Sequence, residues 1–522
     1  MLVTLPILLP LLAAVLCLLS WRHVRLQMTL AVGTMLAHVV VAILLFSEVR
    51  SAGIQHVNVG GWEAPIGITL VADLFACVMI LLTSIVGLAT VLYSCAATDQ
   101  ARAGFGHYPL TLTLLGAVSG AFLTGDLFNL YVWFELLLLS SFVLLTLGGQ
   151  RPQLEGAIKY VTLNLVSSVL FLAAVGLVYG MTGTLNMADL AVRLDALDNP
   201  REATMLAVPL LAAFGIKAAV FPFFFWLPAS YHTPPPVVSA LFAGLLTKVG
   251  VYAIIRSLTL LFDQEWGLLG TAVLVVAGLT MVSGVLGAIA QNDMRRILSF
   301  HIVSQIGYML MGLGIAMVAF SRGGAADAAG TSAAVIALSG AVFYILHHII
   351  VKTNLFLISG VVLWRRGTSE LGRLGGLIST QPFLTGLFVV SAFSLAGIPV
   401  LSGFWAKLAL VRGGLQANAY VIVTVSLIVS LLTLFSMLKI WSRAFWGTVP
   451  DSDDEPGTHA SQSSRRRGGF MTLPIAALAS LTILIGLGAS PVYDLVSETA
   501  AQLLDSRAYV DAVLSIDRED ER

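Results

Sequence analysis

Long apolar stretches alternate with short polar segments along almost the whole chain. A helix that crosses a hydrocarbon core of about 30 Å needs roughly 20 apolar residues. The pattern predicts an all-α polytopic membrane protein with about fourteen transmembrane helices. The predicted spans are residues 2–20, 26–48, 67–95, 107–125, 127–148, 157–181, 203–228, 234–259, 266–290, 297–320, 333–363, 381–411, 415–445 and 470–490.

Two connecting segments are longer than the others. Residues 182–202 are polar, and residues 447–469 contain an acidic run followed by three arginines. The second composition is typical of a disordered loop. The acidic tail after residue 491 is predicted to form one amphipathic surface helix over residues 492–514.

The composition agrees with lipid as the solvent. Of the 522 residues, 58% are hydrophobic and 11% are charged, whereas a soluble domain has about 25% charged residues. The net charge of zero gives no electrostatic reason to expect a nucleic-acid partner. Cys17, Cys77 and Cys95 lack the spacing of a metal or iron–sulfur site, and no glycine motif indicates a nucleotide. We therefore expect no cofactor and no metal.

Basic residues in the loops predict the orientation. Arg22, Arg25, Arg365 and Arg366 fall in alternate connections, and basic residues beside short spans prefer the cytoplasm. This distribution predicts that both termini face outward.

The lysines are distributed differently from the arginines. The chain has 22 arginines but only six lysines, and four of the lysines, Lys217, Lys248, Lys352 and Lys407, lie inside apolar spans. Each such charge opposes insertion by about 2.5–3.5 kcal/mol. Arginine does not deprotonate in proteins, whereas a desolvated lysine can release its proton. The choice of lysine at this depth therefore indicates a proton relay.

Other ionisable groups within the spans fit the same interpretation. Glu135 is the only carboxylate deep inside a predicted helix. His348 and Lys352 are four residues apart and share a helix face, so a proton could pass between them. His347 points about 100° away from that face, which favours a structural role for it.

Helix-breaking residues stand near two of these lysines. Pro222 follows Lys217 by about one turn, and Pro399 and Gly403 precede Lys407. Irregular backbone at membrane depth is tolerated where it is buried or lines a wet cavity. The breaks fall in spans 7 and 12, five spans apart, so those spans run in opposite directions across the membrane. This predicts two inverted five-helix repeats, spans 4–8 and 9–13.

The repeats imply a division of the chain. We expect a three-helix segment over residues 1–100, the first repeat over 101–262 and the second over 263–446. A cytoplasmic loop over 447–469 and a last helix with an acidic tail over 470–522 complete the prediction.

Simpler interpretations apply to several residues. Glu135 and Lys217 could form a structural ion pair, although such residues usually mark ion pathways. His232 and Asp126 lie near span ends, where a loop or cap role competes with a role at the mouth of a water channel. Lys439 stands beside Trp441, an arrangement typical of an interfacial anchor.

The residues described above resemble a known family, the antiporter-like subunits shared by Mrp antiporters and respiratory complex I. The resemblance covers nearly the whole chain and rests on Glu135, Lys217, Lys248 and Lys407. The stretches VYGMTGTLNMADLA, FYILHHIIVKTNLFLISG and LSGFWAKLAL are similar to the Mrp D subunit in particular.

The resemblance implies a proton pathway and partners. Protons would pass along Glu135, Lys217, Lys248, His348 with Lys352, and Lys407. Tyr344 stands one turn before His348, where some relatives have a histidine, which leaves that end of the relay open. The partners would be the Mrp subunits A, B, C, E, F and G in a bacterial cell membrane. The transported ions would be H⁺ and Na⁺, with K⁺ or Li⁺ as other candidates.

Three alternatives stay open at this point. A proton-pumping subunit of complex I or of a membrane-bound hydrogenase would use the same relay, driven by redox chemistry. A scaffold would use its buried charges only to lock helices together. A solute permease is the third, although no half-helix terminus faces an evident substrate pocket. We expect a transporter subunit and not an enzyme.

Overall fold

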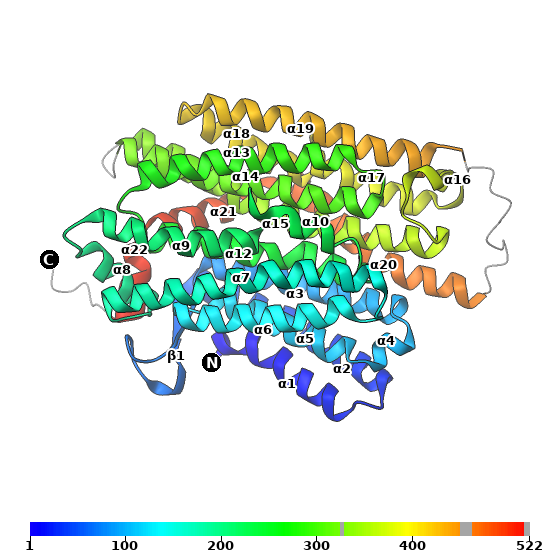
Figure 1. Cartoon of the computed structure of the whole chain (residues 1–522), viewed down its shortest axis with the longest axis horizontal. Helices are drawn as coiled ribbons and strands as arrows, with labels where there is room; N and C mark the ends of the chain where they lie inside the picture. Colours follow the sequence, from blue (N-terminus) through cyan, green and yellow to red (C-terminus); the bar gives the residue numbers. More distant parts are fainter. Residues whose placement is uncertain (324–327, 449–461, 516–522) are drawn as a thin grey trace.

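The computed structural model describes residues 1–323, 328–448 and 462–515 of the chain. Long helices pack side by side in one bundle (Figure 1). Within the described part, twelve helical segments are long and apolar enough to cross a membrane, and His107–Leu123 and Pro382–Ala396 are shorter apolar helices. The all-helical membrane fold is confirmed, while the count of fourteen spans stays a prediction.

The N-terminal part contains the only strands among the described residues. Thr69–Ala72, expected to begin the third span, pair instead with Gln55–Asn58 as an antiparallel hairpin. The helix starts later because Asp73 accepts a hydrogen bond from the Ala76 amide (2.8 Å), as an N-cap residue does. The elements are a 3₁₀ turn over Leu2–Thr4, α1 (Leu5–Leu19), α2 (Val24–Ala52), β1 (Gln55–Asn58), a 3₁₀ turn over Val59–Gly61, β2 (Thr69–Ala72), α3 (Leu74–Ala97) and α4 (Gln100–Gly104).

The next part runs to residue 260 and contains the first interrupted helix. The polar segment expected at residues 182–202 carries a short helix, α8, whose start is capped by Asn186. The elements are α5 (His107–Leu123), α6 (Leu127–Thr146), α7 (Arg151–Thr182), α8 (Met187–Asp195), α9 (Pro200–Ala218), a 3₁₀ turn over Phe223–Phe225, α10 (Trp226–Ser230), α11 (Pro236–Leu241), a π-turn over Phe242–Leu246 and α12 (Thr247–Leu260).

The third part contains the second interrupted helix. Figure 1 shows α9–α10 and α17–α18 running in opposite directions along the bundle. This agrees with the expected inversion. The elements are α13 (Trp266–Ala290), α14 (Met294–Gly323), α15 (Ala328–Arg366), a 3₁₀ turn over Leu371–Arg373, α16 (Leu377–Thr380), α17 (Pro382–Ala396), α18 (Ser402–Gln416), α19 (Tyr420–Ile440) and a π-turn over Trp441–Trp446.

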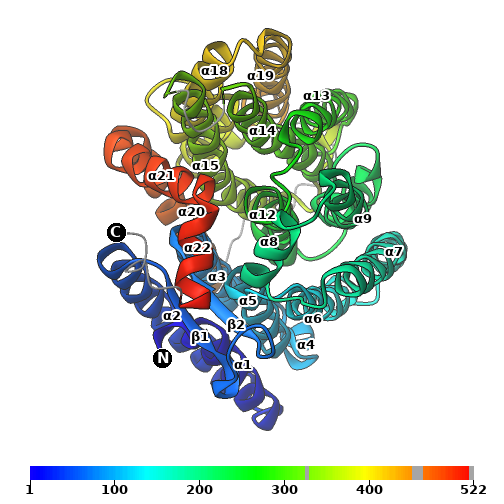
Figure 2. The same ribbon diagram turned by 90° about the vertical axis from the view of Figure 1, so that its left-hand side faces the viewer.

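The C-terminal part differs from the expected single tail helix. Of the predicted 447–469 loop, residues 449–461 lie outside the described residues, and α20 (Gln462–Leu487) begins within the rest. The tail forms two helices, α21 (Ala489–Leu504) and α22 (Ser506–Leu514). Asp505 separates them and caps α22 through the Ala508 amide. Figure 2 shows α22 lying across the end of the bundle near the β1–β2 hairpin.

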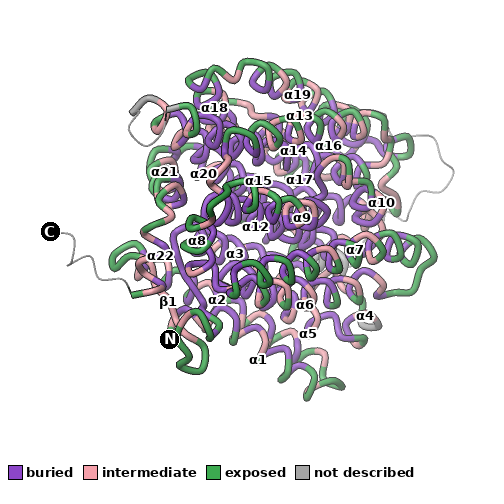
Figure 3. The backbone as a smooth tube through the Cα atoms, turned by 60° about the vertical axis from the view of Figure 1, so that its left-hand side comes forward, coloured by how far each residue is buried: buried purple, intermediate pink, exposed green. Residues whose placement is uncertain are grey.

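The two ends of the bundle can be named by what they carry. The hairpin end carries β1, β2, α8 and α22, and the α16 end carries α4 and α16 (Figure 1). Between them, α12, α14 and α15 form the buried centre (Figure 3). The most apolar windows of Pro236–Leu260 and Met294–Arg322 are 100% buried, against 39% for Arg151–Thr182. The central helices therefore place their side chains in protein, away from lipid.

Candidate functional site

The first helix break lies directly after Lys217. Helix α9 ends at Ala218, and Ala219 adopts a left-handed backbone conformation with φ 59°. Pro222 follows, as predicted, and helical structure resumes before Trp226. The Trp226 indole donates to the Ile216 carbonyl (3.0 Å), which ties the two sides of the break together.

Lys217 is buried among neutral groups. Its amine donates to the Ser168 hydroxyl (3.3 Å) and lies 5.8 Å from the centre of the Phe134 ring. Glu135 is close enough to interact electrostatically with Lys217, but among the described residues no ion pair within 4.0 Å joins them. One Glu135 oxygen, Oε1, is buried without a protein hydrogen-bond partner. A direct structural ion pair is therefore not the arrangement of these two residues.

Lys248 lies at the start of α12, directly after the π-turn over Phe242–Leu246. It is 0% exposed, and its amine donates to the carbonyl of Ala243 inside that turn. A Cβ on Gly250 would lie 2.6 Å from the Ala218 nitrogen and 3.0 Å from the Lys217 carbonyl carbon. Only glycine permits this approach, and it brings α12 against the end of α9 where Lys217 lies.

The second helix break holds Lys407. Helix α17 ends at Ala396, and α18 begins at Ser402 beyond a segment that contains Pro399. The Lys407 amine donates to the carbonyls of Leu395 (3.2 Å) and Ala396 (2.9 Å) and to the Ser430 hydroxyl (2.7 Å). Lys407 thus closes the free carbonyl end of α17 from across the break.

Gly403 is required at the start of α18. A Cβ there would lie 1.9 Å from the Ser394 carbonyl oxygen and 2.8 Å from the His347 ring. The two halves of the broken helix and α15 therefore meet at one point. The sequence predicted Gly403 as part of the break, and the structure gives it this packing role.

The two histidines of α15 face different neighbours. His348 is fully buried, neither ring nitrogen has a protein partner, and it lies within electrostatic range of Lys248 and Lys352. His347 contacts the second break, where its Nδ1 lies 2.8 Å from the Ser402 hydroxyl. The expectation that His347 lies off the relevant face holds only for the Lys248 side. Helix α15 packs against α11 and the π-turn before Lys248, and also against α17 and α18 of the second break.

Lys352 is the third candidate site residue on α15, after His347 and His348. It is 0% exposed and donates to the Leu298 carbonyl of α14 (3.1 Å). No hydrogen bond between Lys352 and His348 occurs in the structure as described. Sharing a helix face thus places the two groups near each other without joining them directly.

Tyr344 connects α15 to polar residues of α14. Its hydroxyl donates to Gln305, and its ring stacks on Tyr308 with centroids 5.1 Å apart. The Tyr308 ring lies 5.0 Å from the Lys407 amine. Tyr344 therefore belongs to a polar cluster that leads toward Lys407.

His301 of α14 is a further polar residue of the candidate site, and the sequence did not predict it as a site residue. It is 0% exposed, its Nε2 lies 2.9 Å from the Ser436 hydroxyl, and Lys352 and Lys407 act on it electrostatically. In the sequence, His301 follows Arg295 and Arg296 at the start of a predicted span, a pattern more typical of a residue at the membrane surface. The spacing of His301, Gln305 and Tyr308 at four and three residues, which puts them on one face, was the available signal.

His232 and Asp126 lie at opposite ends of the bundle. His232 is half-buried at the α16 end, with Nδ1 2.8 Å from the Pro228 carbonyl, and burial lowers the pKa of its imidazole from 6.5. Asp126 caps α6 by accepting from the Asn129 amide (2.7 Å), and burial raises the pKa of its carboxyl. For Asp126 the geometry is that of a helix cap.

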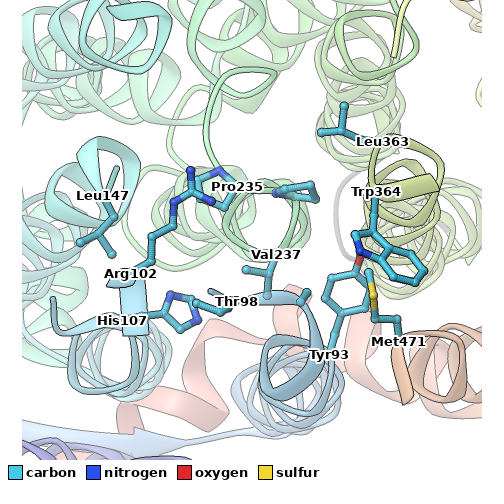
Figure 4. A pocket seen from close by; sticks show the side chains of 13 residues that line it. Tyr93, Thr98, Arg102, His107, Leu147, Pro235, Val237, Leu363, Trp364 and Met471 are labelled. Carbon is cyan, nitrogen blue, oxygen red and sulfur yellow. The ribbon is translucent and has the colours of Figure 1, made fainter. Parts of the chain in front are cut away.

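A small cavity of about 120 Å³ opens at the α16 end, apart from the buried lysines. Figure 4 shows Arg102 extending toward Pro235, with His107 and Tyr93 nearby. None of the four buried lysines lines it. Within the described residues, no group of three His, Cys, Asp or Glu side chains could hold a metal ion.

The matches to known proteins cover the same region. The family described as NADH:quinone oxidoreductase/Mrp antiporter, TM, matches residues 124–433, which include both breaks and all four buried lysines. The D subunit of the Na⁺/H⁺ antiporter of Alkalihalophilus pseudofirmus is 44% identical, over 98% of this chain and 99% of its own. The chain belongs to the family of Mrp antiporter D subunits. The corresponding Na⁺/H⁺ antiporter D subunit of Bacillus subtilis is 39% identical over the same shares.

Solved structures extend the family relationship to the whole fold. A chain of the Mrp complex from Dietzia sp. superposes with a TM-score of 0.88 at 33% identity, covering 98% of this chain and 99% of that one. A chain of the archaeal membrane-bound sulfane sulfur reductase gives 0.83 at 26% identity, covering 98% and 99%. The Mrp D subunits and subunits of respiratory complexes thus share one architecture.

Proposed function

We propose that this chain is the proton-translocating subunit of a multisubunit Na⁺/H⁺ antiporter. Protons would move through the middle of the membrane along Glu135, Lys217, Lys248, the His348–Lys352 face and Lys407. The names of the similar proteins support the class of transporter. The buried lysines support the role of this subunit in it.

One observation carries the proposal. None of the four buried lysines forms an ion pair with a carboxylate among the described residues. Their amines bond only to hydroxyls and backbone carbonyls. A lysine that serves only structure is almost never fully buried without a partner. Amines held by neutral groups are instead free to lose and regain a proton.

The path between the lysines has few direct hydrogen bonds. His348 is within electrostatic range of Lys248 and Lys352, and His301 and His347 are each within range of Lys352 and Lys407. Water would bridge these gaps, since His348 and His347 keep ring nitrogens without protein partners. His347 therefore joins the proposed path on its Lys407 side.

Sodium would follow another route. A hard cation prefers several oxygen ligands, as calcium does. Among the described residues, Glu135 is the only carboxylate that acts electrostatically on any of the four buried lysines, and the lysines repel a cation. We assign the sodium path to a neighbouring subunit or to an interface with one. The partners would be the other Mrp membrane subunits.

The orientation follows from the basic loops. The α16 end, which receives Arg22, Arg25, Arg365 and Arg366, would face the cytoplasm of a bacterial cell. The hairpin end and both termini would then face outward.

The experiment compares two pairs of residues in membrane vesicles that contain the whole complex. Lys217→Ala and Glu135→Ala should abolish sodium-dependent proton movement and leave assembly intact. The matched controls are Lys159→Ala and Glu155→Ala, which break an exposed pair 2.6 Å apart on α7. Near-normal exchange in both Lys217→Ala and Glu135→Ala would refute the assigned roles.

A redox-driven pump is the second candidate, favoured by the similarity to the sulfane sulfur reductase chain. Vesicles that carry the complete operon distinguish the two functions. Proton movement on adding Na⁺ or K⁺ favours the antiporter, whereas movement driven by NADH favours the pump.

A further inference from the structure

The small cavity at the α16 end has hydrogen-bond donors along one side. Thr98 directly follows α3, Arg102 lies on α4, and His107 begins α5. In Figure 4 these three side chains lie on one side of the cavity, and Trp364 and Met471 lie across it. No Asp or Glu is among the described residues that line it. The cavity therefore offers donors and one positive charge without a carboxylate.

Two of the three donor groups lack a protein partner. Thr98 Oγ1 is buried and forms no hydrogen bond. His107 is 4% exposed, and its ring forms no hydrogen bond within the described parts of the chain. Most buried polar side chains in native proteins have a hydrogen-bond partner. These two groups therefore mark a place for a bound molecule or ion.

The guanidinium of Arg102 is held in place at this cavity. Its Nη1 lies 3.0 Å from Asp99, and a guanidinium has five N–H donors, more than this one contact uses. A Cβ on Gly148 would lie 3.0 Å from Arg102 Nε, and the Gly148 φ of 115° also favours glycine. The connection from α6 to α7 can therefore close tightly over the guanidinium.

The size of the cavity limits what it can hold. Its volume is about 120 Å³, whereas pockets for drug-sized ligands and cofactors measure about 300–1,000 Å³. A nucleotide is therefore too large, and a small polyatomic ion or a few water molecules fit.

The donors favour an anion with several oxygens. The planar fork of an arginine matches phosphate and carboxylate oxygens, and an imidazole N–H and a hydroxyl can each donate one further bond. Donors from three side chains suit the several oxygens of a phosphate better than the two of a carboxylate.

We propose that Thr98, Arg102 and His107 bind a small oxyanion of the phosphate class at the α16 end. The oxygens belong either to free phosphate or to the headgroup phosphate of a lipid, which present the same chemistry. The opposite wall comes from α11, α15 and α20, so the oxyanion fills a space between the N-terminal part and the rest of the bundle. Binding involves no proton transfer, and the inference does not depend on the proposed function.

The first measurement is the binding of radiolabelled inorganic phosphate to the complete, lipid-depleted complex at constant ionic strength. We expect saturable binding to the wild-type complex. Arg102→Gln should weaken it about tenfold or more, as loss of a charged hydrogen bond does. Thr98→Val should weaken it about two- to tenfold and leave thermal stability unchanged, because the hydroxyl it removes has no protein partner.

Asp99→Asn is the matched control. It breaks the same 3.0 Å pair as Arg102→Gln, but Asp99 does not line the cavity. Its binding should be equal or tighter, because a nearby negative charge is removed. Arg193→Gln breaks another arginine pair (2.9 Å) on α8 at the hairpin end and should also bind normally.

The second measurement separates the two sources of phosphate. Native mass spectrometry quantifies the phospholipid that stays on the complex through purification. Phospholipid that the wild type retains and Arg102→Gln loses identifies a headgroup, whereas binding of free phosphate without retained lipid identifies the ion. Either result supports the site.

Three outcomes overturn the site. The first is that the wild-type complex binds neither ligand, which leaves water as the only occupant. The second is equal binding in the wild type and Arg102→Gln, or in the wild type and Thr98→Val where Arg102→Gln fails to assemble. The third is an equal loss in Arg102→Gln and Asp99→Asn, which would show that the ion pair matters only for structure.

Discussion

The amine of Lys407 donates a 2.9 Å hydrogen bond to the carbonyl of Ala396, across the break that separates α17 from α18. The end of one half-helix is thus held by a side chain of the other. A positive group is favourable at a helix C-terminus because the helix dipole places a partial negative charge there. If Lys407 releases its proton, that interaction weakens, so proton transfer is coupled to the geometry of the break.

Lys407→Met should abolish exchange, because no proton can be held at the end of the path. Lys439→Met is the matched control: Lys439 also donates to carbonyls at the end of a helix, Ile289 (3.0 Å) and Gln291 (2.6 Å), but near a span end. Each variant should lose about 1 kcal/mol of helix-end stabilisation. Vesicle exchange and the thermal midpoint of the purified complex measure both effects. Equal loss of exchange in the two variants would contradict a special role for Lys407.

Substitutions of the two histidines of α15 should have different effects on proton exchange and on thermal stability. His348→Leu should lower exchange about tenfold or more without reducing stability, since neither ring nitrogen has a protein partner. His347→Leu should also lower the thermal midpoint, because it removes the 2.8 Å hydrogen bond to the Ser402 hydroxyl, which keeps only its 3.1 Å contact with the Ser394 hydroxyl. The expected cost is about 0.5–1.5 kcal/mol. Exchange assays and thermal unfolding of both variants provide the check. A stability loss in His348→Leu equal to that in His347→Leu would show that both are structural.

Gly403→Ala should destabilise the second break, because the new methyl group would lie 1.9 Å from the Ser394 carbonyl oxygen. The backbone there must shift, so we expect both reduced exchange and a lower thermal midpoint. Gly176→Ala on α7 is the control, since nothing lies within 4 Å of its added Cβ. Complex levels on native gels together with exchange rates test the prediction, which fails if the two variants behave alike.

The ion pair between Asp73 and Arg256 should stabilise the hairpin end. The two side chains are 3% and 8% exposed and lie 2.5 Å apart, and Tyr509 of α22 covers Arg256 at 5.2 Å. Asp73→Asn leaves a buried charge unpaired, which costs about 3–5 kcal/mol. The complex should therefore show a clearly lower thermal midpoint.

Two further variants test this assignment. Asp189→Asn breaks a more exposed pair with Arg193 (2.9 Å) and should change stability little. Combining Asp73→Leu with Arg256→Met should recover much of the loss, because no unpaired charge remains. No recovery in the double variant would mean that the charges do more than pair with each other.

Much of the site could be predicted from local features of the sequence. Apolar length and the cost of a buried charge identified the helices and the four lysines, because lipid acts on every span in the same way. Pro222 and Pro399 located the two breaks, since proline lacks the backbone donor that a helix needs. These properties belong to single residues or single segments, so no knowledge of the fold was required.

Contacts between distant segments were decided by the tertiary structure alone. Residues 69–72 are apolar enough for a span, yet pairing with β1 makes them a strand. His301 is buried because α14 packs in the centre of the bundle, although Arg295 and Arg296 earlier in the same helix are typical of the membrane surface. Glu135 and Lys217 approach each other without pairing directly, and the Tyr231 hydroxyl is left unsatisfied. Hydropathy and helical period fix what a helix can bury, whereas the packing of its neighbours decides which groups each face meets.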